Sequence, residues 1–226
     1  MNKLNVFIDT SAFSHLASID IELNRCKPHK WLWNFFNVHT CESVKNEFKK
    51  NIKNASQNSK SINKILNNNK RLSNNKKVIP EVKHTKKIEN KWLSKYYYNK
   101  SLSKKDEGER HLICSVAELI YHNKFNRVIV VLDDRDANKF IKKISDETQI
   151  AEVWTSLDLL IYLFFFYNNI PVNFVESAIR NIAGSSSFPI NEWKQKGQLE
   201  SDARLNLIKN YYNKINRTKK FKQIIV

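Results

Sequence analysis

The feature that most constrains the fold is a pair of short apolar runs, each ending directly in an aspartate. Residues 4–8 (Leu-Asn-Val-Phe-Ile) precede Asp9, and residues 127–132 (Arg-Val-Ile-Val-Val-Leu) precede Asp133. The second run does not alternate apolar with polar residues, so it predicts a central parallel strand buried on both faces. Parallel strands point their carboxyl ends to one edge of a sheet. We therefore expect Asp9 and Asp133 at one edge, where open α/β folds carry out chemistry.

The segments around these runs have mostly helical patterns. Apolar residues at helical spacing predict a helix over residues 106–120, and short strands are expected at residues 37–40 and 151–154. Alternating strands and helices predict an α/β fold, a three-layer parallel sheet flanked by helices over residues 1–185. Further helices are expected at residues 11–16, 42–50, 137–144, 157–167 and 171–182.

Two regions depart from this pattern. Residues 50–104 are dense in Lys, Asn and Ser and predict a basic, helical insertion, with a lightly amphipathic helix near residues 62–66. Within it, Trp92 and Tyr96–Tyr98 stand among lysines, and they would either stack on unpaired bases or anchor the insertion. Residues 186–226 predict a C-terminal helical extension with a basic tail.

The composition points to a polyanionic partner. Lys and Arg number 39 against 22 Asp and Glu, a net charge of +17, which favours nucleic acid. An AT-rich genome is the competing explanation for the lysines. The scattered cysteines fit a reducing cytoplasm, and the histidines form no HExxH motif, so a zinc enzyme is not expected. The most apolar stretch, residues 159–167, is far shorter than the roughly 20 residues of a membrane span.

Further acidic residues lie where helices are expected. Glu47 belongs to the helix after the second strand, and Asp106 and Glu109 open the helix before the central strand. Several carboxylates brought to one edge without cations would repel one another. A hard divalent cation, Mg²⁺ or Mn²⁺, is the simplest stabiliser. Such an ion can activate water and stabilise charge at phosphorus, which predicts phosphodiester hydrolysis.

Each acid also has an ordinary structural interpretation. Asp9 could cap the helix that follows it, and Glu47 could be a surface residue paired with Lys50. Asp106 and Glu109 could form a capping box. Capping or solvent exposure is the preferred interpretation of Asp134 and Asp136.

Five segments, in order, resemble the motifs of PIN-domain nucleases, the family that includes the toxin ribonucleases of toxin–antitoxin systems. The resemblance covers residues 4–50 and 106–185. The matching segments are residues 6–13 (Val-Phe-Ile-Asp-Thr-Ser-Ala-Phe), 43–48 (Ser-Val-Lys-Asn-Glu-Phe), 106–110 (Asp-Glu-Gly-Glu-Arg), 130–137 (Val-Val-Leu-Asp-Asp-Arg-Asp-Ala) and 153–160 (Val-Trp-Thr-Ser-Leu-Asp-Leu-Leu).

The resemblance implies a Mg²⁺- or Mn²⁺-dependent endonuclease of toxin or defence type, usually acting on RNA. The implied catalytic and metal-binding residues are Asp9, Glu47, Glu109 and Asp133, with Asp106 and Asp134 as alternative metal ligands. The implied substrate-positioning residues are Ser11, Thr10 and Arg135.

The partners considered are RNA, a cognate inhibitor protein and a second copy of the chain, with no membrane partner. The main alternative function is a non-catalytic, PIN-like module that binds nucleic acid or protein. A phosphoryl-accepting receiver domain ranks lower, because it needs paired acids after the first strand and here Thr10 and Ser11 follow Asp9.

Overall fold

The computed structural model describes residues 3–12, 15, 36–55, 83–96, 107–122, 127–166, 170–183 and 198–225. Within these ranges a four-stranded, all-parallel sheet has the strand order β2-β1-β3-β4. Val6 on β1 pairs with Val38 on β2 and with Ile129 on β3. The strands are β1 (Leu4–Ile8), β2 (Phe36–His39), β3 (Val128–Val131) and β4 (Glu152–Trp154).

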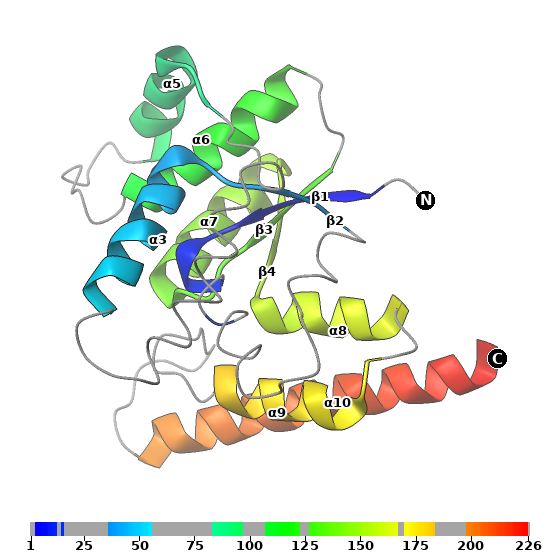
Figure 1. The fold of residues 1–226 in the computed structure, drawn as a ribbon. Coiled ribbons are helices and arrows are strands. Elements are labelled where there is room, and N and C mark those ends of the chain that lie inside the picture. Colours follow the sequence, from blue (N-terminus) through cyan, green and yellow to red (C-terminus); the bar gives the residue numbers. More distant parts are fainter. Residues whose placement is uncertain are drawn as a thin grey trace.

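Helices flank this sheet on both faces, as Figure 1 shows, so the expected parallel α/β fold is confirmed. One face is covered by α3 (Glu42–Ala55), α6 (Glu107–Tyr121) and α7 (Arg135–Thr148), with α5 (Lys86–Tyr96) packed outside α6. The other face is covered by α8 (Ser156–Phe166), α9 (Val172–Ala183) and α10 (Gln198–Ile225).

The core lies in two parts, one on each face of the sheet. Ile8 and Ile129 point toward the cluster built with α8, α9 and α10. Phe7 and Val130 point the other way, toward α6 and α7. All four side chains are at most 1% exposed, and burying one such side chain stabilises the fold by about 1.5–3 kcal/mol. Burial on both faces explains why the central strands show no apolar–polar alternation.

Several element boundaries differ from the sequence expectations by a few residues. The second strand begins at Phe36, one residue early, and α7 begins at Arg135. The early start of α7 has a local cause: the side chain of Asp134 accepts hydrogen bonds from the backbone N–H groups of Asp136 and Ala137. Such a cap satisfies donors that the first helical turn leaves unpaired. Capping, the preferred interpretation of Asp134, is therefore confirmed.

The predicted insertion and extension are described in part. Residues 83–96 carry α5, whose Ile88 is buried with the α6 cluster. The helix expected near residues 62–66, Asp106 and the side chains of Trp92 and Tyr96–Tyr98 lie outside the described residues. The C-terminal helix is present as α10, and its Tyr211 and Ile215 are buried in the core beneath α8 and α9.

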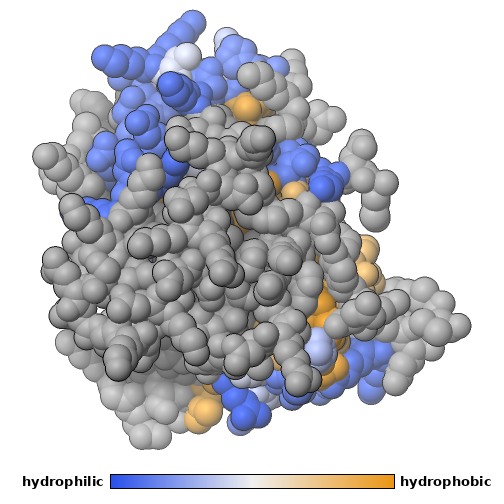
Figure 2. All heavy atoms as spheres, viewed as in Figure 1, coloured by the Kyte–Doolittle hydropathy of each residue, from blue (hydrophilic) through white to orange (hydrophobic). Residues whose placement is uncertain are grey.

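The surface visible in Figure 2 separates hydrophilic from apolar regions. Hydrophilic side chains gather over the upper left, where α3 and α5 lie, and along the lower right, where α10 lies. Within the described ranges, the large exposed apolar side chains are Tyr121, Phe166 and Leu205. The described helices include none long and apolar enough to cross a membrane.

Candidate functional site

The order of the strands creates a switch point between β1 and β3. The chain goes from β1 to β2 on one side and later places β3 on the other side of β1. At such a point the connections leave in opposite directions, and α/β proteins bind ligands there, at the carboxyl ends of the strands; this place is called the crevice below. Asp9 and Asp133 follow the two strands that flank this crevice. The backbone N–H of Asp9 donates to the carbonyl of Val131 (3.0 Å), which holds the strand ends together.

Ser11 links the two strand ends. Its hydroxyl donates to Oδ2 of Asp9 (2.8 Å) and accepts hydrogen bonds from the backbone N–H groups of Asp133 (3.3 Å) and Asp134 (3.1 Å). One donor and two acceptor sites are all that a hydroxyl offers. The N–H of Ser11 also donates to Asp9 Oδ2 (3.2 Å), so Asp9 begins the helical turn at Thr10 in the way a capping residue does.

The third element at the crevice is α3, which brings Glu47 to Asp9. Oε2 of Glu47 lies 3.3 Å from the hydroxyl of Thr10. The first turn of α6 packs against the same carboxylate, because a Cβ atom added at Gly108 would lie 3.1 Å from Glu47 Oε2. Glycine therefore leaves the space that the carboxylate fills.

The electrostatics of the crevice oppose ionisation of its acids. The pKa of Asp9 is raised, chiefly because burial strips the carboxylate of water and also because Asp134 carries like charge. The pKa of Glu47 is raised by desolvation first and then by the charges of Asp9 and Asp134, but Glu47 is an exposed residue, so solvent screens this shift more than that of Asp9. Hydrogen bonds from Thr10 and Ser11, and the charge of Lys50, oppose these shifts only in part. Asp9, Glu47 and Asp134 are called the acid cluster below.

Asp133 is placed differently from the other acids. Its side chain is fully buried, Oδ1 accepts a hydrogen bond from the N–H of Ser156 (2.7 Å), and Oδ2 pairs with Nδ1 of His15 (2.8 Å). With both oxygens engaged by the protein, this carboxylate anchors the start of α8 to the end of β3. Asp134 is the neighbouring acid whose charge acts on Asp9 and Glu47, so it is grouped with them in the acid cluster, although its Oδ1 also caps α7.

The other predicted site residues have the following positions. Glu109 is half-buried in the first turn of α6, next to Gly108. Arg135 begins α7 and pairs with the exposed Asp136 (3.0 Å), in keeping with a solvated Asp136. His15 was not predicted from the sequence. Its spacing of four residues from Ser11, one turn of helix, is the signal that could have placed it near the crevice.

No family profile, curated protein or solved structure matches this chain at a significant level. The resemblance to PIN-domain nucleases therefore rests on the five sequence segments, and the functional argument rests on the geometry of the crevice.

Proposed function

We propose that this protein is a divalent-metal-dependent endonuclease with a PIN-like fold, acting on RNA as a toxin or defence enzyme. The observation that carries the proposal is the acid cluster. Carboxylates that follow β1 and β3, and one from α3, lie close enough at the switch point for their like charges to act on one another, and desolvation together with this repulsion raises the pKa values of Asp9 and Glu47. A cation between the carboxylates would offset both their loss of hydration and their mutual repulsion.

The donor chemistry suits Mg²⁺ or Mn²⁺. These ions take hard oxygen ligands and keep several waters, so two or three carboxylates are sufficient. Asp9, Glu47 and Asp134 would hold the ion, and Glu109, in the turn beside Gly108, is the further candidate from the sequence. When bound, the ion would lower the pKa of water and stabilise charge at phosphorus.

The chain's own hydrogen bonds would keep these ligands in place. Ser11 fixes Asp9 and orients the backbone that leads to Asp134. Thr10 contacts Glu47 (3.3 Å), which ties α3 to the end of β1. Because these bonds are made within the fold, the acids are oriented before an ion or substrate arrives, which reduces the entropic cost of binding.

A basic hollow lies beside the same edge of the sheet. It has a volume of about 510 Å³ and is lined by Thr155, which follows β4, and by Lys142, Lys214 and Arg217. Lys214 is partly neutralised by Asp158 (3.1 Å). Cationic side chains at this edge of the sheet would attract the phosphates of a nucleic acid and direct its backbone toward the acid cluster.

The test is cleavage of single-stranded and structured RNA by Asp9→Asn, with Asp146→Asn on the exposed side of α7 as the matched control. In Mg²⁺ or Mn²⁺ we expect Asp9→Asn to lose activity by a factor on the order of 10³ and the control to retain it. Cleavage by Asp9→Asn at the parent rate would contradict the site.

Calorimetric titration with Mn²⁺ separates the two functional hypotheses. A nuclease should bind Mn²⁺ at the acid cluster, and Asp9→Asn should weaken that binding. If the parent protein neither binds Mn²⁺ nor cleaves RNA, but still retains RNA or a partner protein, the non-catalytic module is the better description.

A further inference from the structure

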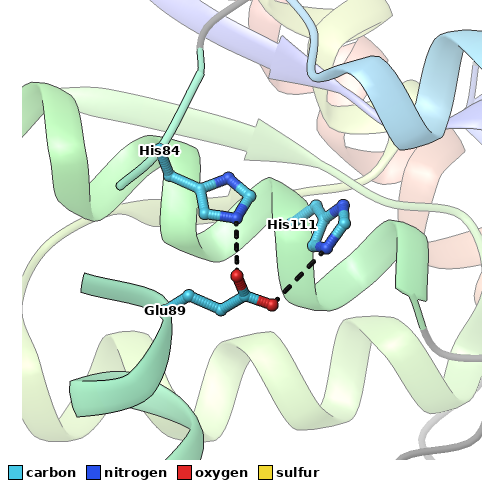
Figure 3. A group of neighbouring side chains, drawn as sticks. All are labelled: His84, Glu89 and His111. Atoms are coloured by element: carbon cyan, nitrogen blue, oxygen red, sulfur yellow. Dashed lines mark ion pairs between the residues drawn. The ribbon is translucent and has the colours of Figure 1, made fainter. Parts of the chain in front are cut away.

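We propose that His84, Glu89 and His111 form a second metal site, specific for a transition metal of the zinc type, which fastens α5 to α6. Figure 3 shows the three side chains converging from two elements. His84 precedes α5, Glu89 lies in the first turn of α5, and His111 lies in α6. These three residues are called the histidine cluster below.

The spacing of the ligand atoms fits a shared ion better than direct ion pairs. Nε2 of His84 lies 3.6 Å from one Glu89 oxygen, and Nε2 of His111 lies 3.7 Å from the other. Charge-assisted hydrogen bonds between such groups are shorter, about 2.7–2.9 Å. In a tetrahedral zinc site, bonds of about 2.0–2.1 Å place neighbouring ligand atoms roughly 3.3 Å apart. One ligand atom from each residue already lies within 4.8 Å of the others, so small side-chain rotations complete the site.

The outer nitrogens of both rings already have partners. Nδ1 of His84 faces the hydroxyl of Ser115 (3.5 Å), and Nδ1 of His111 contacts the hydroxyl of Ser43. Metal-binding histidines usually donate their second N–H to an acceptor, which fixes the tautomer and the ring orientation. In that arrangement each Nδ1 carries the proton, and both Nε2 atoms present lone pairs toward Glu89.

The burial of the cluster suits a bound ion. The side chains of His84, His111 and Glu89 are 13%, 22% and 28% exposed. A hollow of about 420 Å³, lined by both histidines together with Ser43 and Lys83, lies against the cluster, and a water from it would serve as the fourth ligand. Two imidazoles and one carboxylate favour zinc over magnesium, which takes oxygen ligands.

The structural role follows from how α5 is attached. Among the described side chains of α5, Ile88 is buried in the core, and Thr85 before the helix bonds to Glu118 on α6 (2.8 Å). Zinc bound by His84, Glu89 and His111 would add a strong link between the same two helices. This inference stands apart from the proposed nuclease activity, because it concerns different residues and a different class of ion.

The test uses the full chain after treatment with a chelator. Titration with Zn²⁺ should show one site per chain and an increase in Tm. Glu89→Gln and, separately, His111→Gln should each lower zinc affinity by at least about tenfold. His122→Gln is the matched control, because His122 follows the end of α6, has a half-exposed side chain and lies outside the histidine cluster, and it should bind zinc like the parent.

Two further measurements assign the ion to this cluster. Zinc-edge X-ray absorption should show two imidazole ligands in the parent protein. Asp9→Asn should retain zinc binding, and Glu89→Gln should retain Mn²⁺ binding, so a failure here is distinguishable from a failure of the nuclease hypothesis. The proposal is overturned by absence of zinc binding, by parent affinity in Glu89→Gln, or by an oxygen-only ligand set.

Discussion

The acid cluster and the histidine cluster adjoin α6 at points one helical turn apart, but they differ in the charges that they bring together. Gly108 touches the carboxylate of Glu47, and His111, three residues later, faces Glu89. Two of the acids, Asp9 and Asp134, follow strands and the third, Glu47, lies on α3, and the fold places their like charges near one another. The histidines stand between helices, beside one carboxylate and two serine hydroxyls. Ionisation of the acid cluster is therefore opposed unless a cation offsets the repulsion, whereas the neutral histidine cluster brings together no like charges; in the proposed site a bound ion would strengthen it.

The largest expected contrast in stability concerns the serines of the two clusters. Ser11→Ala would leave the backbone N–H groups of Asp133 and Asp134 without their acceptor, at a cost of about 2–3 kcal/mol. Ser115→Ala removes a longer contact to His84 (3.5 Å) and should cost less than about 1 kcal/mol. Urea denaturation in chelator measures both free energies of unfolding. Equal losses would show that Ser11 is not the link between the strand ends.

The sequence predicted the acid cluster better than the histidine cluster for a physical reason. An apolar run that ends in an aspartate predicts both a buried strand and the residue where the strand ends. Asp9 and Asp133 could therefore be assigned to one edge of the sheet, and β1 and β3 do pair in parallel. The run does not predict which of the two adjacent acids, Asp133 or Asp134, is buried in the fold and bound by other elements. That choice depends on Ser156 and His15, which bind Asp133 and come from other elements.

The amino-acid sequence contains no comparable signal for the histidine cluster. His84 and Glu89 come from the insertion, where apolar residues are sparse and the pattern gave no clear helix. His111 joins them only because α5 packs on α6. Searching for closely spaced metal-binding motifs cannot find ligands that tertiary packing brings together. The same argument explains why α10 was predicted as a helix, but not as part of the core through Tyr211 and Ile215.

The next contrast is the effect of pH on the acid cluster without metal. Burial raises the pKa of Asp9 above its ordinary value of 3.8, so the folded state keeps a proton that the unfolded state has released. The stability of the parent therefore falls as pH rises from about 3.8 to the folded pKa, by at most about 1.4 kcal/mol per pH unit. Asp9→Asn removes this penalty and keeps an oxygen to accept the hydrogen bond from Ser11.

In chelator, Asp9→Asn should thus be more stable than the parent at neutral pH, and the gain should vanish below pH 3.8. Denaturation curves at several pH values measure this difference. Added Mn²⁺ should stabilise the parent more than the variant, reversing the order. If Asp9→Asn is less stable than the parent at neutral pH without metal, the hydrogen bonds of Asp9 outweigh the repulsion and the acid cluster is not under electrostatic stress.

The smallest expected change in stability comes from Gly108→Ala, which should weaken metal binding at the acid cluster and leave the histidine cluster unchanged. Gly108→Ala should stabilise α6 by at most about 1 kcal/mol, because glycine is a poor helix former. The new Cβ would lie 3.1 Å from Glu47 Oε2, and the flexible glutamate must move aside by a few tenths of an ångström. We expect a modest gain in Tm, several-fold weaker Mn²⁺ binding and unchanged zinc affinity. Equal weakening of both metals would mean that α6 itself had shifted, and that the two clusters are coupled through the helix that they share.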